Sequence, residues 1–332
     1  MTLTVKPAHR WSASMAELPT SSKLILFGGK TTANNGYNGL SNDTWSWDGS
    51  VFANISTGIS GNTLVGPSPR AESTMAFDKT YVTLVGGTNG IENLSETWSY
   101  STGSGWFKQA LTNVEDNGYT IPTLIRGASS AYQSGVSGGE VILFGGTTSF
   151  ERHYSKTSWV WVTGNPGSYT LLSPTTSPTG RMYASMASSA TTAILFGGKN
   201  FDGPLSDIFS WNGSAWTAIN TGQTPGVDAP APRYAASFSY CANDSVFVLH
   251  GGISTPGLFS NTAGFCNDSW SFSTMTNLWS KITGPQPPAR AFASSAYLTA
   301  TTSVYLFGGL NSLMALQDLW SFSVAQGWQL VG

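Results

Sequence analysis

The sequence predicts an all-β fold, a six-bladed β-propeller in which each blade contributes four antiparallel strands. An apolar run ends in a pair of glycines six times along the 332 residues. The pairs recur 58, 59, 52, 54 and 57 residues apart, and their first members are Gly28, Gly86, Gly145, Gly197, Gly251 and Gly308. An aromatic-rich strand and then a further aromatic residue follow each pair. A period a little above fifty residues that holds several short strands is typical of a propeller blade.

The first strand of each repeat follows an arginine. The arginines stand 16 to 19 residues before their glycine pairs, at Arg10, Arg70, Arg126, Arg181, Arg233 and Arg290. Small residues come next, as in residues 291–297. Short side chains suit the crowded inner edge of a radial sheet, so this segment is predicted to be the innermost strand.

The second and third strands lie on either side of the glycine pair. The second is the apolar run itself, for example residues 24–27, and it is predicted to be buried between blades. The third alternates aromatic and small residues, which places its rings on one face of the sheet. The tryptophans predicted to pack between blades are Trp45, Trp98, Trp159, Trp270 and Trp320.

A tight turn and a fourth strand complete each repeat. Asp48-Gly49 and Asn212-Gly213 predict two-residue hairpin turns, because Gly and Asn readily adopt positive backbone φ. The fourth strand opens with an aromatic residue, which is Phe52, Trp106, Tyr169, Trp216, Trp279 or Trp328. Every blade is therefore contiguous in sequence, and the ring closes by packing the last blade against the first. Residues 2–5 could add an edge strand at that closure.

This succession of arginine, small strand, apolar strand, glycine pair, acidic residue, aromatic strand and final aromatic resembles the kelch repeat. The copies extend from about residue 8 to residue 331. The resemblance implies one kelch-type propeller over residues 1–332, with blades at about 8–56, 68–112, 124–173, 179–220, 231–283 and 288–331. Two positions depart from the pattern. Lys156 or Thr157 stands where the other repeats carry an acidic residue, and His250 replaces the hydrophobe before the fifth glycine pair.

The composition excludes some classes of partner. Charged residues make up only 10% of the chain, against roughly 25% in ordinary soluble domains, and the net charge is -2. Binding to nucleic acid or to an anionic membrane therefore has no electrostatic support. No segment is apolar and long enough to cross a bilayer, and no signal peptide is visible. The uncharged surface favours a secreted, virion or cell-surface location.

The two cysteines are predicted to remain free thiols. Cys241 is expected where the first strand of the fifth blade turns into the second, and Cys266 just before the third strand, at the opposite end of that blade. A strand of about six residues spans roughly 20 Å, whereas the Cα atoms of a disulfide lie within about 7 Å of each other.

No catalytic or metal-binding residues are predicted, and no cofactor is expected. The three histidines, His9, His153 and His250, do not have the spacing of a metal site. Kelch-like propellers also occur in copper-radical oxidases and in iron-dependent specifier proteins, but the ligand motifs of those enzymes are absent. The chain is therefore predicted to be a non-catalytic recognition module that binds a protein or a glycan. A carbohydrate-active enzyme, such as an epimerase, and a structural subunit of a virion or cell-surface assembly are the alternatives.

The predicted working face carries the long loops after the glycine pairs and before the arginines. These loops, 30–42, 110–125, 147–156 and 253–267, mix aromatic residues with Gly, Asn and Ser, a composition suited to recognition. The candidate ligand-binding residues in them are Tyr37, Tyr119, His153, Tyr154 and Phe259. Residues that vary beside the repeated arginines are further candidates, namely Trp11, Tyr183, Tyr234 and Phe292.

The six arginines allow two interpretations. Placed at the start of the inner strands, they could ring the mouth of the channel and hold a carboxylate or a sulfate. A residue repeated in every blade is explained more simply by structure, through bonds to loop carbonyls or to the acidic residue of a third strand. The structural interpretation is favoured.

Overall fold

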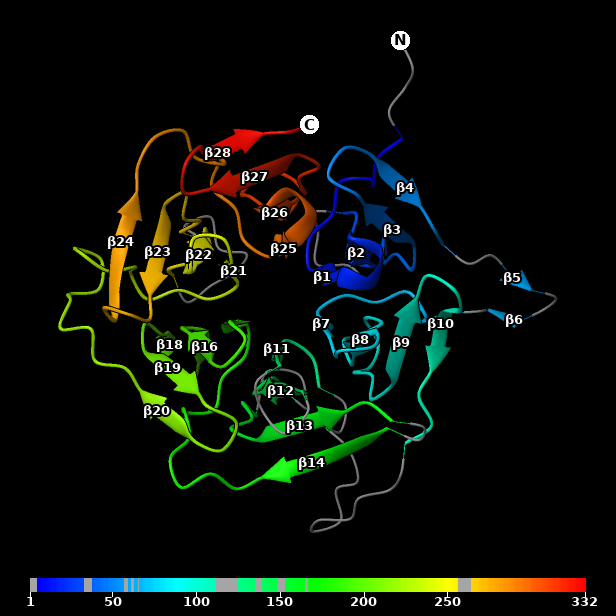
Figure 1. Ribbon diagram of the computed structural model, residues 1–332, viewed down its shortest axis with the longest axis horizontal. Coiled ribbons are helices and arrows are strands. Elements are labelled where there is room, and N and C mark those ends of the chain that lie inside the picture. Colours follow the sequence, from blue (N-terminus) through cyan, green and yellow to red (C-terminus); the bar gives the residue numbers. More distant parts are fainter. Residues whose placement is uncertain are drawn as a thin grey trace.

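The structure is a computed structural model, which describes residues 5–32, 38–56, 59–60, 63–64, 66–111, 125–134, 139–147, 153–164, 167–255 and 264–332. Six antiparallel four-stranded sheets surround a central channel, as Figure 1 shows. The only helical elements among the described residues are two 3-10 turns, η1 (Pro19–Ser21) and η2 (Thr299–Thr301). The prediction of an all-β, six-bladed propeller is confirmed.

Each blade uses four strands in chain order from the channel outward, and two-stranded ribbons are added in two loops. Blades 1 and 2 contain β1 (Ser14–Leu18), β2 (Lys23–Phe27), β3 (Thr44–Trp47), β4 (Phe52–Asn54), β7 (Thr74–Phe77), β8 (Val82–Val85), β9 (Thr97–Ser101) and β10 (Gly105–Lys108). Blades 3 and 4 contain β11 (Ser129–Gln133), β12 (Glu140–Phe144), β13 (Ser158–Val162), β14 (Ser168–Leu172), β15 (Ser185–Ser188), β16 (Ala193–Phe196), β19 (Ile208–Trp211) and β20 (Trp216–Ala218). Blades 5 and 6 contain β21 (Ser237–Cys241), β22 (Val246–His250), β23 (Ser269–Ser273), β24 (Leu278–Ile282), β25 (Ser294–Leu298), β26 (Ser303–Phe307), β27 (Leu319–Ser323) and β28 (Gly327–Leu330). The ribbons are β5 (Ile59–Ser60) with β6 (Thr63–Leu64), and β17 (Lys199–Asn200) with β18 (Gly203–Pro204).

Adjacent blades share a hydrophobic core at each of the six seams. Between blades 1 and 2, for example, Ile25 and Phe27 of β2 pack with Leu84 of β8 and Trp106 of β10. All four side chains are at most 3% exposed, so the apolar second strand is buried between its neighbours, as its sequence predicts. Such burial contributes about 1.5 to 3 kcal/mol for each large apolar side chain, which makes seam packing the main stabilising term.

The tryptophans of the third strands are not equally buried. Trp45, Trp159 and Trp270 are 4 to 7% exposed and belong to seam cores. Trp98 and Trp320 are only partly buried at the margins of their cores. The prediction that all five are core residues is therefore correct for three of them.

The aromatic residue at the first or second position of each fourth strand packs across the seam to the preceding blade. The Trp106 indole N–H donates a 2.8 Å hydrogen bond to the Thr44 hydroxyl, and Trp216 and Trp328 make the same bond at 2.9 Å to serines. Tyr169 pairs its hydroxyl with Thr97 at 2.8 Å. These bonds allow a large ring with a polar edge to be buried without an unsatisfied donor.

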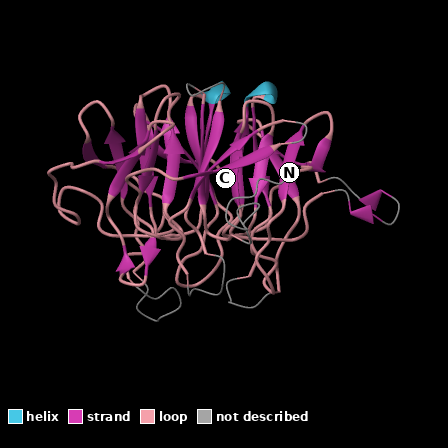
Figure 2. Cartoon of the chain, turned by 90° about the horizontal axis from the view of Figure 1, so that it is seen from below, coloured by secondary structure: helices cyan, strands magenta, loops and turns pink. Residues whose placement is uncertain are grey.

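The two faces of the propeller differ. The 3-10 turns lie on one face, and the loops after the glycine pairs extend from the other, as Figure 2 shows. We call the second the mouth face. The glycine pairs are required there, because Gly28 has a φ of +69° and a Cβ at that position would lie 2.7 Å from the Arg70 carbonyl oxygen.

The cysteines are both free, as predicted. Cys241 ends β21 and is fully buried, whereas Cys266 lies in the segment before β23 and is partly buried. They therefore lie at opposite ends of blade 5.

Candidate functional site

A closed ring of backbone hydrogen bonds surrounds the channel at the mouth face. Each blade supplies one residue, which lies two positions after the repeated arginine in five blades and directly after Arg126 in blade 3. The backbone N–H of each of these residues donates to the carbonyl oxygen of the equivalent residue in the preceding blade. The six distances are 2.8 to 3.1 Å. The ring residues are Ser12, Glu72, Gly127, Tyr183, Ala235 and Phe292. The last bond, from Ser12 to Phe292, joins the first blade to the sixth, so the ring has no gap.

All six ring residues adopt the left-handed backbone conformation, with φ between +53° and +64°. Only Gly127 does so without steric cost. For bulky residues such as Tyr183 and Phe292 this conformation is unusual and strained, and such strain concentrates at functional sites. The sequence therefore places two aromatic rings at the channel mouth although the backbone there favours glycine.

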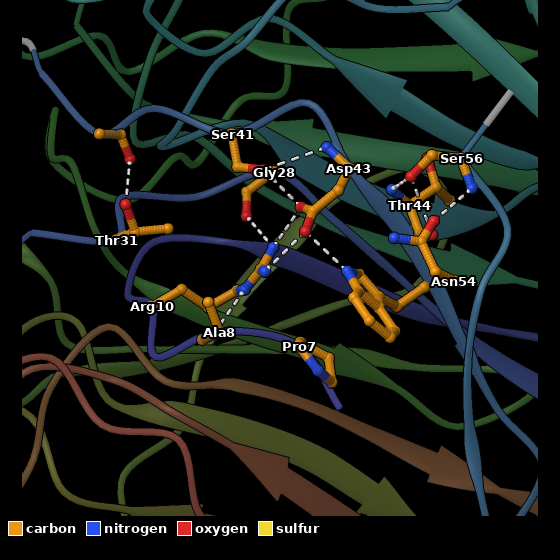
Figure 3. Close-up of polar contacts among 12 residues, drawn as sticks. Pro7, Ala8, Arg10, Gly28, Thr31, Ser41, Asp43, Thr44, Asn54 and Ser56 are labelled. Carbon is orange, nitrogen blue, oxygen red and sulfur yellow. Dashed lines mark hydrogen bonds and ion pairs between the residues drawn. The ribbon is translucent and has the colours of Figure 1, made fainter. Parts of the chain in front are cut away.

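Five of the repeated arginines serve the loops and not the channel. The Arg10 guanidinium is 1% exposed and donates to both carboxylate oxygens of Asp43, at 2.5 and 2.8 Å, and to the Gly28 carbonyl at 2.9 Å (Figure 3). The equivalent ion pairs are Arg70–Glu96, Arg181–Asp207, Arg233–Asp268 and Arg290–Asp318. Each arginine therefore fastens a glycine turn to the start of the third strand, as the structural interpretation expects.

Asp43 and Glu96 illustrate how the acidic partners in two of these pairs are held in their charged form. Burial alone would raise the pKa of Asp43, but hydrogen bonds from Arg10, Ser41 and the Trp45 indole outweigh it and lower that pKa. Glu96 shows the same balance, with its pKa lowered to about 2 by Lys108, Arg70 and Trp98 against the effect of burial.

Arg126 differs from the other five arginines. The Gly87 N–H donates to the carbonyl of Ile125, as the Gly29 N–H does to Arg70, so Ile125 holds the arginine position of blade 3. The acidic position is held by Thr157, whose hydroxyl accepts the Trp159 indole N–H at 3.2 Å. Both members of the ion pair are thus replaced together in this blade.

The displaced guanidinium of Arg126 lies at the channel mouth beside Glu72. Its Nη1 is 3.7 Å from a Glu72 carboxylate oxygen, and the two side chains are 14% and 6% exposed. The Tyr183 hydroxyl donates to the same carboxylate at 2.6 Å. Glu72 therefore organises groups from two other blades.

Two lysines add further positive charge over aromatic rings. Lys30 Nζ lies 4.8 Å from the centre of the Trp11 ring, and Lys199 Nζ lies 5.3 and 5.8 Å from Tyr234 and Tyr183. Burial lowers the pKa of Lys30, and the nearby Arg126 lowers it further against the opposing effect of Glu72. Among the described residues, the mouth thus brings three cationic side chains close to the Glu72 carboxylate.

The four candidate residues predicted beside the arginines come together here. Trp11 and Phe292 meet edge to face at 5.5 Å, Tyr183 and Phe292 at 5.0 Å, and Tyr183 stacks with Tyr234 at 6.3 Å. Trp11 and Tyr234 are at most 2% exposed, whereas Tyr183 is only partly buried. Tyr183 is therefore the ring of this cluster most open to a ligand.

A small cavity of about 170 Å³ lies at the ring, between Ser12, Glu72, Tyr183 and Phe292. Deeper in the channel the walls are small residues and hydroxyls. Ser14, Ser129, Ser185 and Ser294 donate to backbone carbonyls of the next blade, at 2.6 to 2.9 Å. The charged groups of the site are thus concentrated at the mouth, and the deeper channel is neutral.

Of the five loop candidates, the structure describes only His153 and Tyr154. Tyr154 is partly buried and meets the ring of Phe201 edge to face at 4.6 Å, while His153 is exposed. Phe201 is itself 71% exposed, and Ile91 and Leu313 in equivalent loops are 77% and 80% exposed. Tyr37, Tyr119 and Phe259 lie outside the described residues.

Sequence reasoning missed Lys30, Glu72, Lys199 and the exposed loop hydrophobes. All of them occupy positions at which the six repeats carry different residues, shortly after the repeated arginine or after the glycine pair. A comparison of the six copies at those positions would have singled them out.

The family model for the KLHDC2/KLHL20/DRC7 Kelch-repeats domain matches residues 131–331, which is more than half of the chain. The chain belongs to this kelch-repeat family. The kelch propeller is also similar to the solved structure described as "Structure of YjhT", with a TM-score of 0.71 over 98% of both chains. The two are 13% identical, so this likeness concerns the fold alone. No curated protein matches the chain significantly.

The kelch fold is consistent with a protein-interaction module. Within the described part of the chain, no three His, Cys, Asp or Glu side chains are grouped to hold a metal ion. None of its helices is long and apolar enough to span a membrane.

Proposed function

We propose that this kelch propeller is a recognition module that binds an acidic segment of a protein partner at the channel mouth. The observation that supports it is the cluster of three cationic side chains there, Lys30, Arg126 and Lys199, beside the carboxylate of Glu72. The chain as a whole has a net charge of -2, so this clustering of positive charge is local.

The cations lie in positions where their electrostatic attraction for an anion is strong. Lys30 is 6% exposed and the Arg126 side chain 14%, so both have lost much of their hydration. Two opposite charges 4 Å apart attract by about 4 kcal/mol near a protein surface, against about 1 kcal/mol in bulk water. A carboxylate from a partner would therefore be bound more strongly here than on an open surface.

The surrounding loops offer apolar contact. Ile91, Phe201 and Leu313 follow the glycine pairs of three different blades and are exposed on the mouth face. Large exposed hydrophobes that encircle a charged pocket suit a protein partner, because apolar contact adds affinity while the charges fix orientation.

An acidic glycan is the second candidate, because its carboxylate would meet the same three cations and its ring could rest on Tyr183. The same site gives an uncharged glycan no electrostatic advantage. A carbohydrate-active enzyme and a structural subunit remain alternatives from the sequence, and no side-chain arrangement among the described residues favours either.

The test is selection of peptides from a random library on the immobilised propeller. We expect enrichment of acidic sequences whose affinity falls when salt is raised. The double variant Arg126→Gln/Lys199→Gln should bind them at least about tenfold more weakly, which corresponds to about 1.4 kcal/mol.

The matched control is Lys23→Gln, which removes a charge at the start of β2, on the side of the 3-10 turns. It should leave peptide affinity unchanged, and unfolding midpoints should show that all variants are folded. Enrichment without acidic bias, or equal losses in Lys23→Gln and the double variant, would refute the proposal. Selective binding of acidic sugars in a parallel glycan array would favour the second candidate.

A further inference from the structure

One seam of the propeller has a smaller fourth-strand aromatic residue than the other five. We call the contact between blade 6 and blade 1 the closing seam. At the other seams the fourth strand opens with Trp106, Tyr169, Trp216, Trp279 or Trp328, each at most 4% exposed. At the closing seam this position is held by Phe52, which is smaller and partly exposed.

The partner of that ring has changed as well. In the preceding blade, Thr44, Thr97, Ser158 and Ser269 provide hydroxyls for the indole or phenol of four seams. The equivalent residue of blade 6 is Leu319, since it pairs with Phe307 as Thr44 pairs with Phe27. The closing seam therefore lacks both the large ring and the polar group that would anchor it.

A cavity of about 360 Å³ occupies this seam. Its apolar walls are Val5, Trp47, Phe52, Leu319 and Val331, and Lys6, Ser50 and Gln317 contribute the polar part. β4 and β28 flank the seam in Figure 1. The volume falls within the range of small-molecule sites, roughly 300 to 1,000 Å³, which are typically apolar with a few polar groups.

One residue of the cavity wall, Trp47, also carries a buried hydrogen-bond donor. Trp47 is 5% exposed, and its indole N–H has no hydrogen-bond partner among the described residues. By contrast, the equivalent Trp161 of blade 3 donates to Asp78 of the neighbouring blade at 3.2 Å. The equivalent Trp211 of blade 4 also has an indole N–H without a partner in the described part of the chain, so the volume and the lining of the cavity carry the inference.

We propose that this cavity is a binding site for a small, uncharged aromatic molecule of about the size of indole. Four other seams of the same chain bury an indole at the equivalent position, stacked edge to face on the last residue of the second strand, as Phe196 and Trp279 do at 4.9 Å. At the closing seam Phe52 already contacts Phe307 edge to face at 5.4 Å and Trp47 at 4.7 Å. The flat ring of a ligand would extend this aromatic cluster. The inference is independent of the proposed function, because none of its residues belongs to the channel mouth.

The experiment uses the whole chain with indole as the probe. Indole should bind with a dissociation constant on the order of 1 mM, as expected for a fragment of this size. Binding should shift the side-chain N–H resonance of Trp47, which is assigned by its absence from the Trp47→Phe spectrum.

The matched variant is Phe52→Trp, which fills the cavity with the ring used at the other seams. It should weaken indole binding at least about tenfold and should not lower the unfolding midpoint, because it fills a void. Phe52→Trp/Leu319→Thr, which restores the hydroxyl partner as well, provides a second filled cavity if the single variant folds poorly.

Three results would overturn the proposal. The first is an unmoved Trp47 resonance at the solubility limit of indole, and the second is equal binding by the wild type and by a folded filled variant. The third is binding that requires removal of residues 1–4, which would identify the chain's own first residues as the occupant.

Discussion

The Tyr183 hydroxyl and the Glu72 carboxylate form a 2.6 Å hydrogen bond across 111 residues of sequence, between blades 4 and 2. The ring residue of the intervening blade 3 is Gly127. A Cβ on Gly127 would lie 2.7 Å from a carbon of the Tyr183 ring. The absence of a side chain in one blade thus allows residues of its two neighbours to meet.

Gly127→Ala should therefore destabilise the propeller and break the contact between Tyr183 and Glu72. A left-handed conformation costs an alanine about 1 to 2 kcal/mol, and displacement of the tyrosine adds to this. The matched change Ala235→Gly, at a ring position with φ of +56°, should alter stability by less than about 1 kcal/mol. Chemical unfolding of both variants measures the difference. Equal stabilities would show that Gly127 is not needed for space.

The blade 3 pair of Ile125 and Thr157 should be transferable to another blade. Arg290→Ile leaves the Asp318 carboxylate without its buried partner and should cost about 3 to 5 kcal/mol. Adding Asp318→Thr removes that stranded charge, so the double variant should be more stable than Arg290→Ile alone. A double-mutant cycle by urea unfolding checks this. Strict additivity of the two changes would contradict the assignment of Ile125 and Thr157 to these positions.

His250 should make the fold sensitive to acid. Burial first, and then the charge of Arg290, lower its pKa from 6.5 to about 3, so the folded state binds this proton less readily than the unfolded state. The stabilisation is present above pH 6.5 and is lost as the pH falls toward 3, with a slope of up to about 1.4 kcal/mol per pH unit. His250→Phe, which introduces the residue found at this position in four other blades, should flatten the profile. The exposed control His153→Gln should not, and an unchanged profile in His250→Phe would refute the assignment.

The thiols should react only after unfolding. Burial, reinforced by the Asp244 carboxylate, raises the pKa of Cys241 to about 12, so hardly any thiolate forms at pH 8. Burial also raises the pKa of Cys266. We expect negligible alkylation of Cys241 in the native chain and two labels per chain in denaturant without reductant, measured by intact mass. Fewer than two labels in denaturant would indicate a disulfide.

The fold could be predicted from the sequence because each blade repeats the same local chemistry. Glycine pairs, alternating aromatics and turn residues each dictate a strand or a turn within one repeat, and six copies reinforce one another. The closing seam could be predicted from the sequence only in part. Phe52 is visible in the sequence as the smallest of the six fourth-strand aromatics, but only the packing of two blades shows that a cavity results.

The register of blade 3 could have been predicted more accurately. In five repeats the arginine is followed at the third and fourth positions by a small residue and by Ser or Thr, as in Arg290 with Ala293 and Ser294. The same spacing before Ala128 and Ser129 identifies Ile125, and not Arg126, as the equivalent residue. Arg126 lies 19 residues before its glycine pair, close to the spacing in the other repeats, and this similarity obscured the shift of one residue.

The clustering at the channel mouth could not be predicted in the same way. Lys199 lies over Tyr234 of the next blade, and Glu72 receives groups from blades 3 and 4. These contacts depend on the distance between inner strands of different repeats, which no single repeat encodes. Sequence reasoning named the aromatic residues of the mouth and Arg126, but not Lys30, Glu72 or Lys199.

The backbone ring at the mouth joins the first and last blades by the same type of hydrogen bond that joins every other pair of neighbouring blades. The bond from Ser12 to Phe292 has the same geometry as the five bonds between blades that are also linked by peptide. No blade can separate without breaking two members of the ring, whichever blade it is. At the channel mouth, the junction between the last and first blades is therefore held by the same backbone bond as every other junction, and the special features of the closing seam are confined to its side chains.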